Sequence, residues 1–164
     1  MNVAISFIVL SIFYSIFINI SSYKKKYVPT IDTKLFYKMI TLNLVGLILE
    51  LLCYFTVFNN LSFLPQFLNR LYLTYLLIFI ALFNLYTIYL FYKVNHYKQE
   101  EIDGFYNKIS KISYVLFTVI ILTVLLFPIE FHNVNGYIYS TGMGINIIYF
   151  VATVFIVFWS ILII

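Results

Sequence analysis

The chain has 164 residues, of which 63% are hydrophobic and only 10% are charged, and its mean hydropathy is +1.00. An average soluble domain carries about a quarter charged residues, so this composition excludes an ordinary soluble globular protein. The formal net charge of +4 gives no reason to expect a nucleic-acid partner, because the basic residues are interleaved with long apolar runs, as in membrane proteins.

Five apolar runs follow one another along the chain, covering residues 3–21, 39–58, 71–92, 112–127 and 143–164. Each is long enough to cross a bilayer, for which a helix needs about 20 residues, and the fourth is the shortest. Only short connections remain between them. We therefore expect an all-α integral membrane protein, a bundle of about five transmembrane helices that forms a single domain over residues 1–164.

The first run is predicted to be a retained membrane anchor. Met1 and Asn2 provide no basic start, the lysines of SSYKKKY follow the apolar core, and no A-x-A-like cleavage site is present. A secretory signal would show the opposite pattern.

The basic residues predict the orientation. Nine of the ten lie in or beside the connections after the first and third runs, and Arg70 alone lies on the other side. The positive-inside rule makes the nine cytoplasmic, so we expect a multi-pass protein of the cell membrane with its N-terminus outside and residue 164 inside. The nine are Lys24, Lys25, Lys26, Lys34, Lys38, Lys93, Lys98, Lys108 and Lys111.

The second run carries a carboxylate in an otherwise apolar stretch, NLVGLILE. At about 100° per residue, Asn43, Gly46, Glu50 and Tyr54 share one helix face. Gly46 allows close approach of another helix, and Asn43 and Glu50 can hydrogen-bond across helices, so we expect this face to point into the bundle. Glu50 is then either a packing residue or a site that couples a ligand, a proton or a signal.

Three polar residues elsewhere are candidate partners of Glu50. Asn84 lies in the third run and Asn146 in the fifth. Arg70 heads the third run, about 12 Å above Glu50 at a rise of about 1.5 Å per residue. The candidate ligand or signal-coupling residues are Asn43, Gly46, Glu50, Tyr54, Arg70 and Asn84.

The connections contain two further predicted elements. Ile102, Phe105, Tyr106, Ile109 and Ile112 recur at near-helical spacing, which predicts an interfacial helix leading into the fourth span. Before the fifth span, the Asn-Gly of VNGYIY lies between β-forming residues, a strong hairpin signal. This predicts a short extracellular β-hairpin, either a simple connector or a recognition surface, with the candidate residues Asn135, Gly136, Tyr137 and Tyr139.

Motifs for catalysis are absent from the sequence. It contains no P-loop, HExxH, GxSxG or paired-cysteine pattern, and Cys53 is its only cysteine. His96 and His132 fall on opposite sides of the predicted membrane. We therefore expect no catalytic residues, no metal and no cofactor, so the chain by itself is not an enzyme.

Four segments carry a family resemblance: KKKYVPTIDTKLFYKMI, NLVGLILELL, NRLYLTYLL and GYIYSTGMGINIIY. In them the chain resembles the multi-span N-terminal sensor regions of bacterial sensor histidine kinases of the low-GC Gram-positive type, which are similar to regions that precede diguanylate cyclase domains. The resemblance covers most of the chain. It implies a signal-input module that perceives an extracellular or membrane signal and passes it to a cytoplasmic output domain.

The sequence departs from that family at its end. A sixth span and a kinase or cyclase module would be expected, but the chain stops at FIVFWSILII without a polar or basic flank. We expect it to be truncated before both. The expected partners are the lipid bilayer, a second copy in a homodimer, and an unidentified peptide or small-molecule signal.

Two other functions remain open. One is a small proton-coupled transporter in which Glu50 loads and releases a proton, although the sequence has no second intramembrane acid and no inverted repeat of the transporter kind. The other is a non-catalytic assembly partner that binds membrane proteins through its small and polar faces.

Overall fold

The computed structural model describes residues 3–24, 30–58, 64–95, 98–134 and 137–163. Within these residues, five helices are long and apolar enough to cross a membrane, which confirms the helical multi-pass architecture expected from the sequence. The helices are α1 (Val3–Lys24), α2 (Ile31–Phe58), α3 (Leu64–Val94), α4 (Gln99–Leu126) and α5 (Met143–Ile163). Two short strands, β1 (Glu130–Val134) and β2 (Tyr137–Thr141), lie between α4 and α5.

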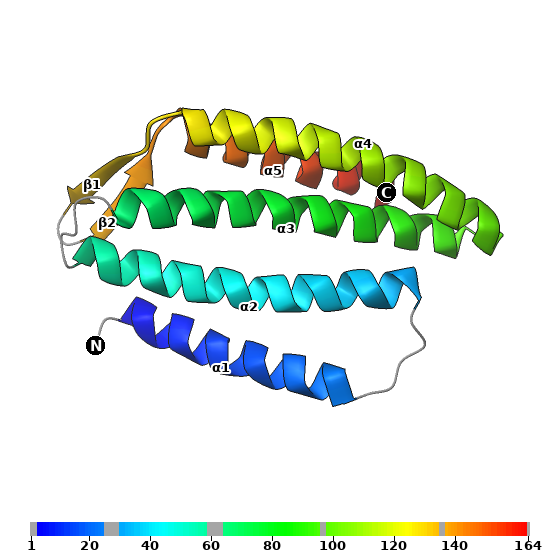
Figure 1. Ribbon diagram of the computed structural model, residues 1–164, viewed down its shortest axis with the longest axis horizontal. Helices are drawn as coiled ribbons and strands as arrows, with labels where there is room; N and C mark the ends of the chain where they lie inside the picture. Colours follow the sequence, from blue (N-terminus) through cyan, green and yellow to red (C-terminus); the bar gives the residue numbers. More distant parts are fainter. Residues whose placement is uncertain (1–2, 25–29, 59–63, 96–97, 135–136, 164) are drawn as a thin grey trace.

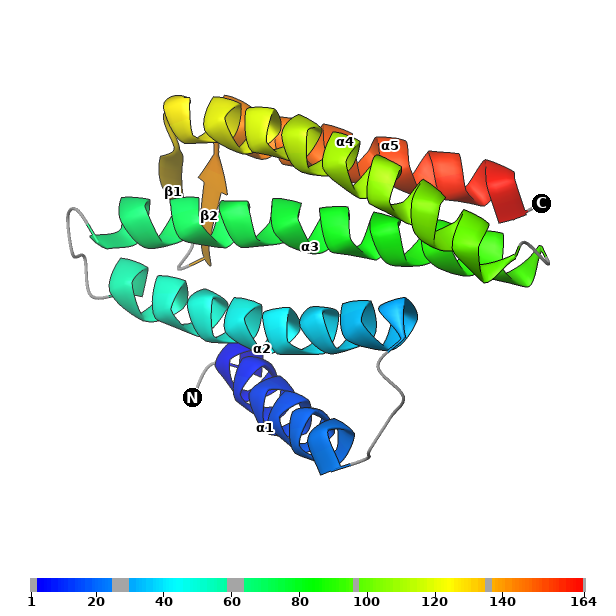
Figure 2. The same cartoon turned by 45° about the vertical axis from the view of Figure 1, so that its right-hand side comes forward.

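The helices alternate in direction along the chain. Helices α1 to α4 lie side by side in sequence order, and α5 packs against both α3 and α4 (Figure 1). Helix α1 is inclined to α2, whereas α2 and α3 run nearly alongside each other (Figure 2). Strands β1 and β2 lie at the end of the molecule where α1 begins, and α5 ends at the opposite end (Figures 1 and 2).

Three helices begin earlier than the apolar runs that predicted them. Helices α2, α3 and α4 start at Ile31, Leu64 and Gln99, so each adds polar turns to its apolar segment. The helix predicted from residues 102–112 leads into the fourth span without a break, because those residues form the first turns of α4. No proline interrupts this segment, and Gly104 costs a helix only about 1 kcal/mol relative to alanine.

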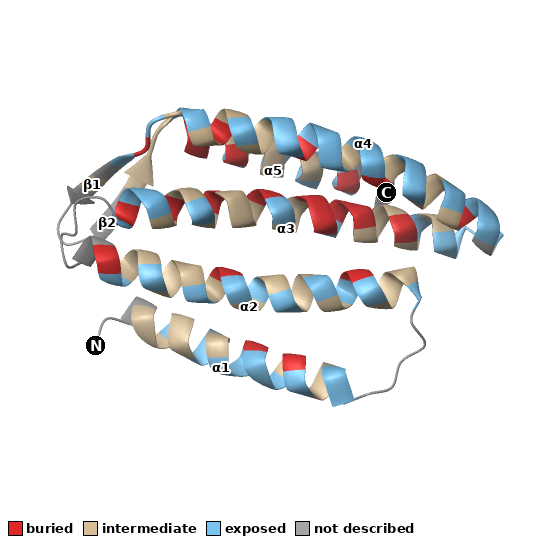
Figure 3. Cartoon of the chain, viewed as in Figure 1, coloured by how far each residue is buried: buried red, intermediate tan, exposed pale blue. Residues whose placement is uncertain are grey.

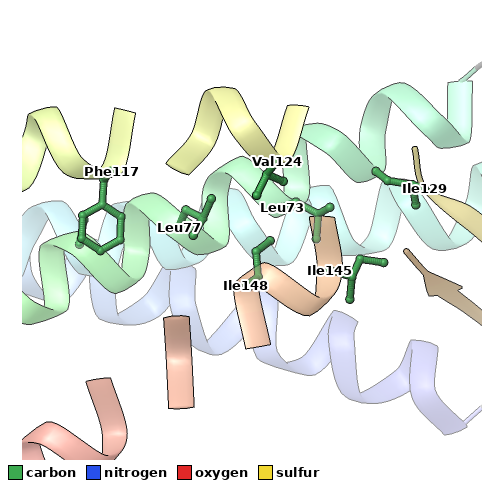
Figure 4. Close-up of a cluster of buried hydrophobic side chains, with 8 residues drawn as sticks. Leu73, Leu77, Phe117, Val124, Ile129, Ile145 and Ile148 are labelled. Carbon is green, nitrogen blue, oxygen red and sulfur yellow. The ribbon is translucent and has the colours of Figure 1, made fainter. Parts of the chain in front are cut away.

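A cluster of buried hydrophobic side chains joins α3, α4 and α5 (Figure 4). Phe117 of α4 also stacks on Phe155 of α5, with ring centroids 5.8 Å apart. Colouring by burial shows the largest share of buried positions along α3 (Figure 3). These three helices therefore form a unit with an apolar core. The cluster consists of Leu73, Leu77, Ala81, Phe117, Val124, Ile129, Ile145 and Ile148.

Helix α1 is attached to α2 through polar contacts. The Asn19 amide donates to the carbonyl of Ile40 at 3.4 Å, and the Thr41 hydroxyl donates to Asn19 Oδ1 at 3.2 Å. The Tyr37 hydroxyl donates to the carbonyl of Ser22 at 3.1 Å. These bonds all involve the second half of α1, so they fix that half against the first turns of α2.

The two strands pair antiparallel, from Glu130 opposite Thr141 to Val134 opposite Tyr137. Gly142 follows β2 with a φ of 133°, and a Cβ there would lie 2.6 Å from the carbonyl oxygen of Pro128. Only glycine tolerates both conditions. The Gly142 carbonyl then accepts the first backbone hydrogen bonds of α5.

Candidate functional site

The hydroxyl end of the Tyr75 side chain on α3 lies against Gly46 of α2. A Cβ added at Gly46 would overlap the ring edge and the hydroxyl oxygen of Tyr75. Gly46 is buried by this contact. Because Gly46 has no side chain, the Tyr75 side chain can occupy this space. This agrees with the expectation that Gly46 allows another helix to approach.

Glu50 lies one turn after Gly46 and is half-buried. Its carboxyl group interacts electrostatically with the phenol groups of Tyr72 and Tyr75 on α3 and with the Cys53 thiol on its own helix. Among the described residues, neither ion pair involves Glu50, because one joins Lys93 to Asp32 and the other joins His132 to Glu130. Glu50 thus lies close enough to the two phenol groups and the thiol to interact with them electrostatically.

Asn43 departs from the expected inward-facing surface. Its side chain is exposed and lines a groove of about 920 Å³ between α1 and α2. The lining residues fall within 10–18 of α1 and 36–47 of α2, and Phe79 of α3 also lines the groove. The single polar face predicted for α2 is therefore divided, because Asn43 lines the groove while Gly46 meets α3. Tyr54, on a later turn, is half-buried.

The Asn84 side chain forms its hydrogen bonds with residues other than Glu50. Its Oδ1 accepts a hydrogen bond from the indole Nε1 of Trp159 on α5 at 2.7 Å, and its amide nitrogen donates to the carbonyl of Ile80 at 2.9 Å. A second groove of about 680 Å³ runs beside this pair between α3 and α5. Phe79 lines both grooves, so it connects the α1–α2 groove with the α3–α5 contact.

Arg70 lies near the start of α3. Its Nε atom is buried without a hydrogen-bond partner among the residues that the structure describes, and so is the amide nitrogen of the neighbouring Asn69. Neither of the ion pairs recorded for those residues includes Arg70. Among the described residues, the hydrogen bonds and ion pairs of Arg70 and Asn84 therefore do not include Glu50.

The structure describes two of the four candidate residues in the connection between α4 and α5. Asn135 and Gly136 lie outside the described residues, whereas Tyr137 and Tyr139 belong to β2. At the opposite end of the two strands, the His132 Nε2 atom lies 2.7 Å from the Thr141 hydroxyl and 3.7 Å from the Glu130 carboxylate. The contact with Thr141 joins β1 to β2 at the strand ends that lie next to α4 and α5.

Sequence reasoning missed several residues of this region. Ser11, Ser15 and Asn19 recur every four residues in α1, a spacing that places them on one helix face and could have predicted a polar contact surface. Trp159 is the only tryptophan, but nothing in the sequence connects it with Asn84. Tyr75 is one of 16 tyrosines, so its position above Gly46 had no sequence signal.

Comparison of the chain with models of known protein families, with curated proteins and with solved structures finds no match.

Proposed function

We propose that the chain is the membrane-embedded signal-input module of a bacterial sensor, which perceives an extracellular or membrane signal and relays it to a cytoplasmic output domain. The observation that carries this proposal is the packing of Tyr75 over Gly46 beside Glu50. This polar centre lies between the α1–α2 pair and the unit formed by α3, α4 and α5. The resemblance to the sensor regions of histidine kinases supports the same function.

Two kinds of packing hold the molecule together. Apolar side chains form the core of the α3–α4–α5 unit, whereas the contacts of α1 with α2 include several hydrogen bonds. Such bonds between membrane helices contribute only about 0.6–2 kcal/mol each. Helix α1 can therefore shift against α2 at a modest cost, and a ligand that prefers one arrangement would bias the equilibrium.

A path for the signal leads along α3. Tyr75 lies next to Phe79, with ring centroids 6.1 Å apart, and Asn84 binds Trp159 of α5 further along the helix. In the orientation proposed from the lysines, α5 ends at the cytoplasmic face and the β1–β2 pair is extracellular. A displacement of Tyr75 would thus reach the helix that leads to the output domain.

The test joins residues 1–164 to the cytoplasmic part of a histidine kinase and measures phosphorylation of its response regulator. Glu50→Gln keeps the shape of the side chain but removes its charge and proton exchange. We expect it to change the output about fivefold or more, because coupling between sites is typically about 1–3 kcal/mol. Glu101→Gln, at an exposed position of α4, is the matched control. An unchanged output from a Glu50→Gln protein of unchanged stability would refute the role of Glu50.

A proton-coupled transporter is the competing function, since hydroxyl groups near Glu50 could pass a proton to it. The same variants are therefore compared in proteoliposomes under an imposed pH gradient. A sensor should show no proton flux above that of empty liposomes. A flux that Glu50→Gln abolishes and Glu101→Gln retains would replace the sensor with the transporter.

A further inference from the structure

We infer that the groove between α1 and α2 binds an apolar small molecule that carries one uncharged hydrogen-bonding group and no lipid headgroup, such as a long-chain alcohol. This inference deepens the proposed function by naming the chemical class of the signal. It rests on the proposed function for the consequence of binding, but the binding itself can be measured without any output domain.

The groove has the size and shape of a small-molecule site. Its volume is about 920 Å³, within the range of about 300–1,000 Å³ for such sites. It runs along residues 10–18 of α1 and 36–47 of α2, which correspond to about 12 Å and 16 Å of helix. Its walls are mostly apolar, so an elongated hydrocarbon chain fits them.

Four residues with polar groups interrupt these apolar walls, namely Ser11, Tyr14, Ser15 and Asn43. Ser15 is only 4% exposed, and its hydroxyl has no hydrogen-bond partner among the described residues. Asn43, an exposed residue on the facing wall, presents an amide to the same groove. Unpaired polar groups in a hydrocarbon environment are costly. A ligand hydroxyl or carbonyl would pair with these groups.

The depth of the polar groups distinguishes this ligand from ordinary lipid. At about 1.5 Å per residue, Ser15 lies about 5 Å from the middle of the apolar run 3–21 and Asn43 about 8 Å from the middle of the run 39–58. Both would therefore lie inside the hydrocarbon core of a bilayer. The ester groups of a phospholipid are about 15 Å from the bilayer centre, half of a hydrocarbon core of about 30 Å. Phospholipid tails offer only hydrocarbon there, whereas a molecule without a headgroup can place its polar group at this depth.

The closed side of the groove favours a slender ligand. Phe79 lines the groove from α3, and α1 is bonded to α2 through Asn19 and Thr41. The space is therefore a cleft between two joined helices that opens outward beside Phe13 and Tyr14, which are each 67% exposed. A ligand in it would contact Phe79, which adjoins Tyr75 above Gly46, so occupancy would act on the contact assigned to signalling.

The experiment uses the full chain in phosphatidylcholine nanodiscs and three photoreactive probes with the same diazirine-bearing chain. One probe is a long-chain alcohol, one is the matching hydrocarbon, and one is a phosphatidylcholine. We expect the alcohol to label residues 10–18 and 36–47 about fivefold more than either other probe, as one hydrogen bond of about 1 kcal/mol implies. Excess unlabelled alcohol should suppress this labelling.

Substitutions identify the groups that bind the alcohol. Asn43→Leu and Ser15→Ala should each lower labelling by the alcohol toward the level of the hydrocarbon. The matched controls are Asn146→Leu and Thr118→Ala, at exposed positions of α5 and α4 outside the groove, and they should leave labelling unchanged. Thermal unfolding of each variant verifies that the protein remains folded.

Equal labelling of the groove by the three probes would overturn the inference, since bulk lipid would then fill it. Absence of alcohol labelling together with crosslinking of the groove to another polypeptide would also overturn it, in favour of a partner helix. If the alcohol binds as expected but the Glu50→Gln protein shows a proton-flux defect and no change in kinase output, the site stands and the sensor function fails. If the alcohol does not label the groove but Glu50→Gln changes the kinase output, the ligand class is rejected and the sensor function stands.

Discussion

Trp159 of α5 donates a hydrogen bond from its indole nitrogen to the side-chain oxygen of Asn84 in α3, over 2.7 Å. The two residues are 8% and 4% exposed. The apolar cluster contacts α5 through Ile145 and Ile148, near the start of the helix. Apolar packing against the cluster continues as far as Phe155, and the Asn84–Trp159 pair holds α5 against α3 one turn further on.

Replacing Trp159 with phenylalanine should destabilise this part of the protein. The substitution keeps an aromatic ring but leaves Asn84 Oδ1 without its donor, so we expect the free energy of unfolding to fall by about 0.5–2 kcal/mol. Denaturant titration in mixed micelles measures the change. Phe158→Leu, at an exposed neighbouring position, is the control. A double-mutant cycle with Asn84→Leu should give a coupling energy, and strictly additive effects would contradict the bond.

Gly46 and Gly104 should respond oppositely to alanine. At Gly46 the new Cβ displaces the Tyr75 ring, and because that ring can turn, we expect a loss of about 1 kcal/mol. At Gly104 a Cβ meets no atom within 4 Å, so alanine should stabilise α4 by up to about 1 kcal/mol. Unfolding titrations compare the two variants. In a Tyr75→Ala background the cost at Gly46 should vanish, and its persistence would show that Tyr75 is not the cause.

The ion pair between Lys93 and Asp32 should contribute little. The Lys93 Nζ atom lies 2.7 Å from the Asp32 carboxylate, but the side chains are 45% and 19% exposed. Such pairs contribute about 0–1 kcal/mol and are weakened by salt. We expect Asp32→Asn to cost less than about 1 kcal/mol, and Lys111→Gln serves as the control. Exchanging the two charges should restore stability, and failure to do so would assign the cost to something other than the pair.

The orientation predicts which residues face the cytoplasm. In a Cys53→Ser background, single cysteines replace Glu130 or Lys108, both of which are exposed. An impermeant maleimide added to intact cells should label the cysteine at position 130 and should reach position 108 only after permeabilisation, because the lysine-rich connections stay inside. The opposite pattern would reverse the orientation.

The sequence by itself determined the number of helices and the polar positions within them. The length of an apolar run is a local property. A helix of about 20 residues can cross a bilayer because its backbone N–H and C=O groups hydrogen-bond to one another within the helix. The early starts of α2 and α4 were missed because a helix can continue past its apolar segment into polar turns. Periodicity likewise placed Asn43, Gly46 and Glu50 close together on α2.

Only the tertiary structure decided which residues meet. Periodicity gives a side of a helix, but lipid tails are as apolar as the side chains, so burial alone does not select a neighbour. Tyr75 therefore covers Gly46, Asn84 binds Trp159 rather than Glu50, and Asn43 lines a groove with α1. These pairings depend on the fit of small and polar groups between helices, a relation between distant parts of the chain that no local pattern contains.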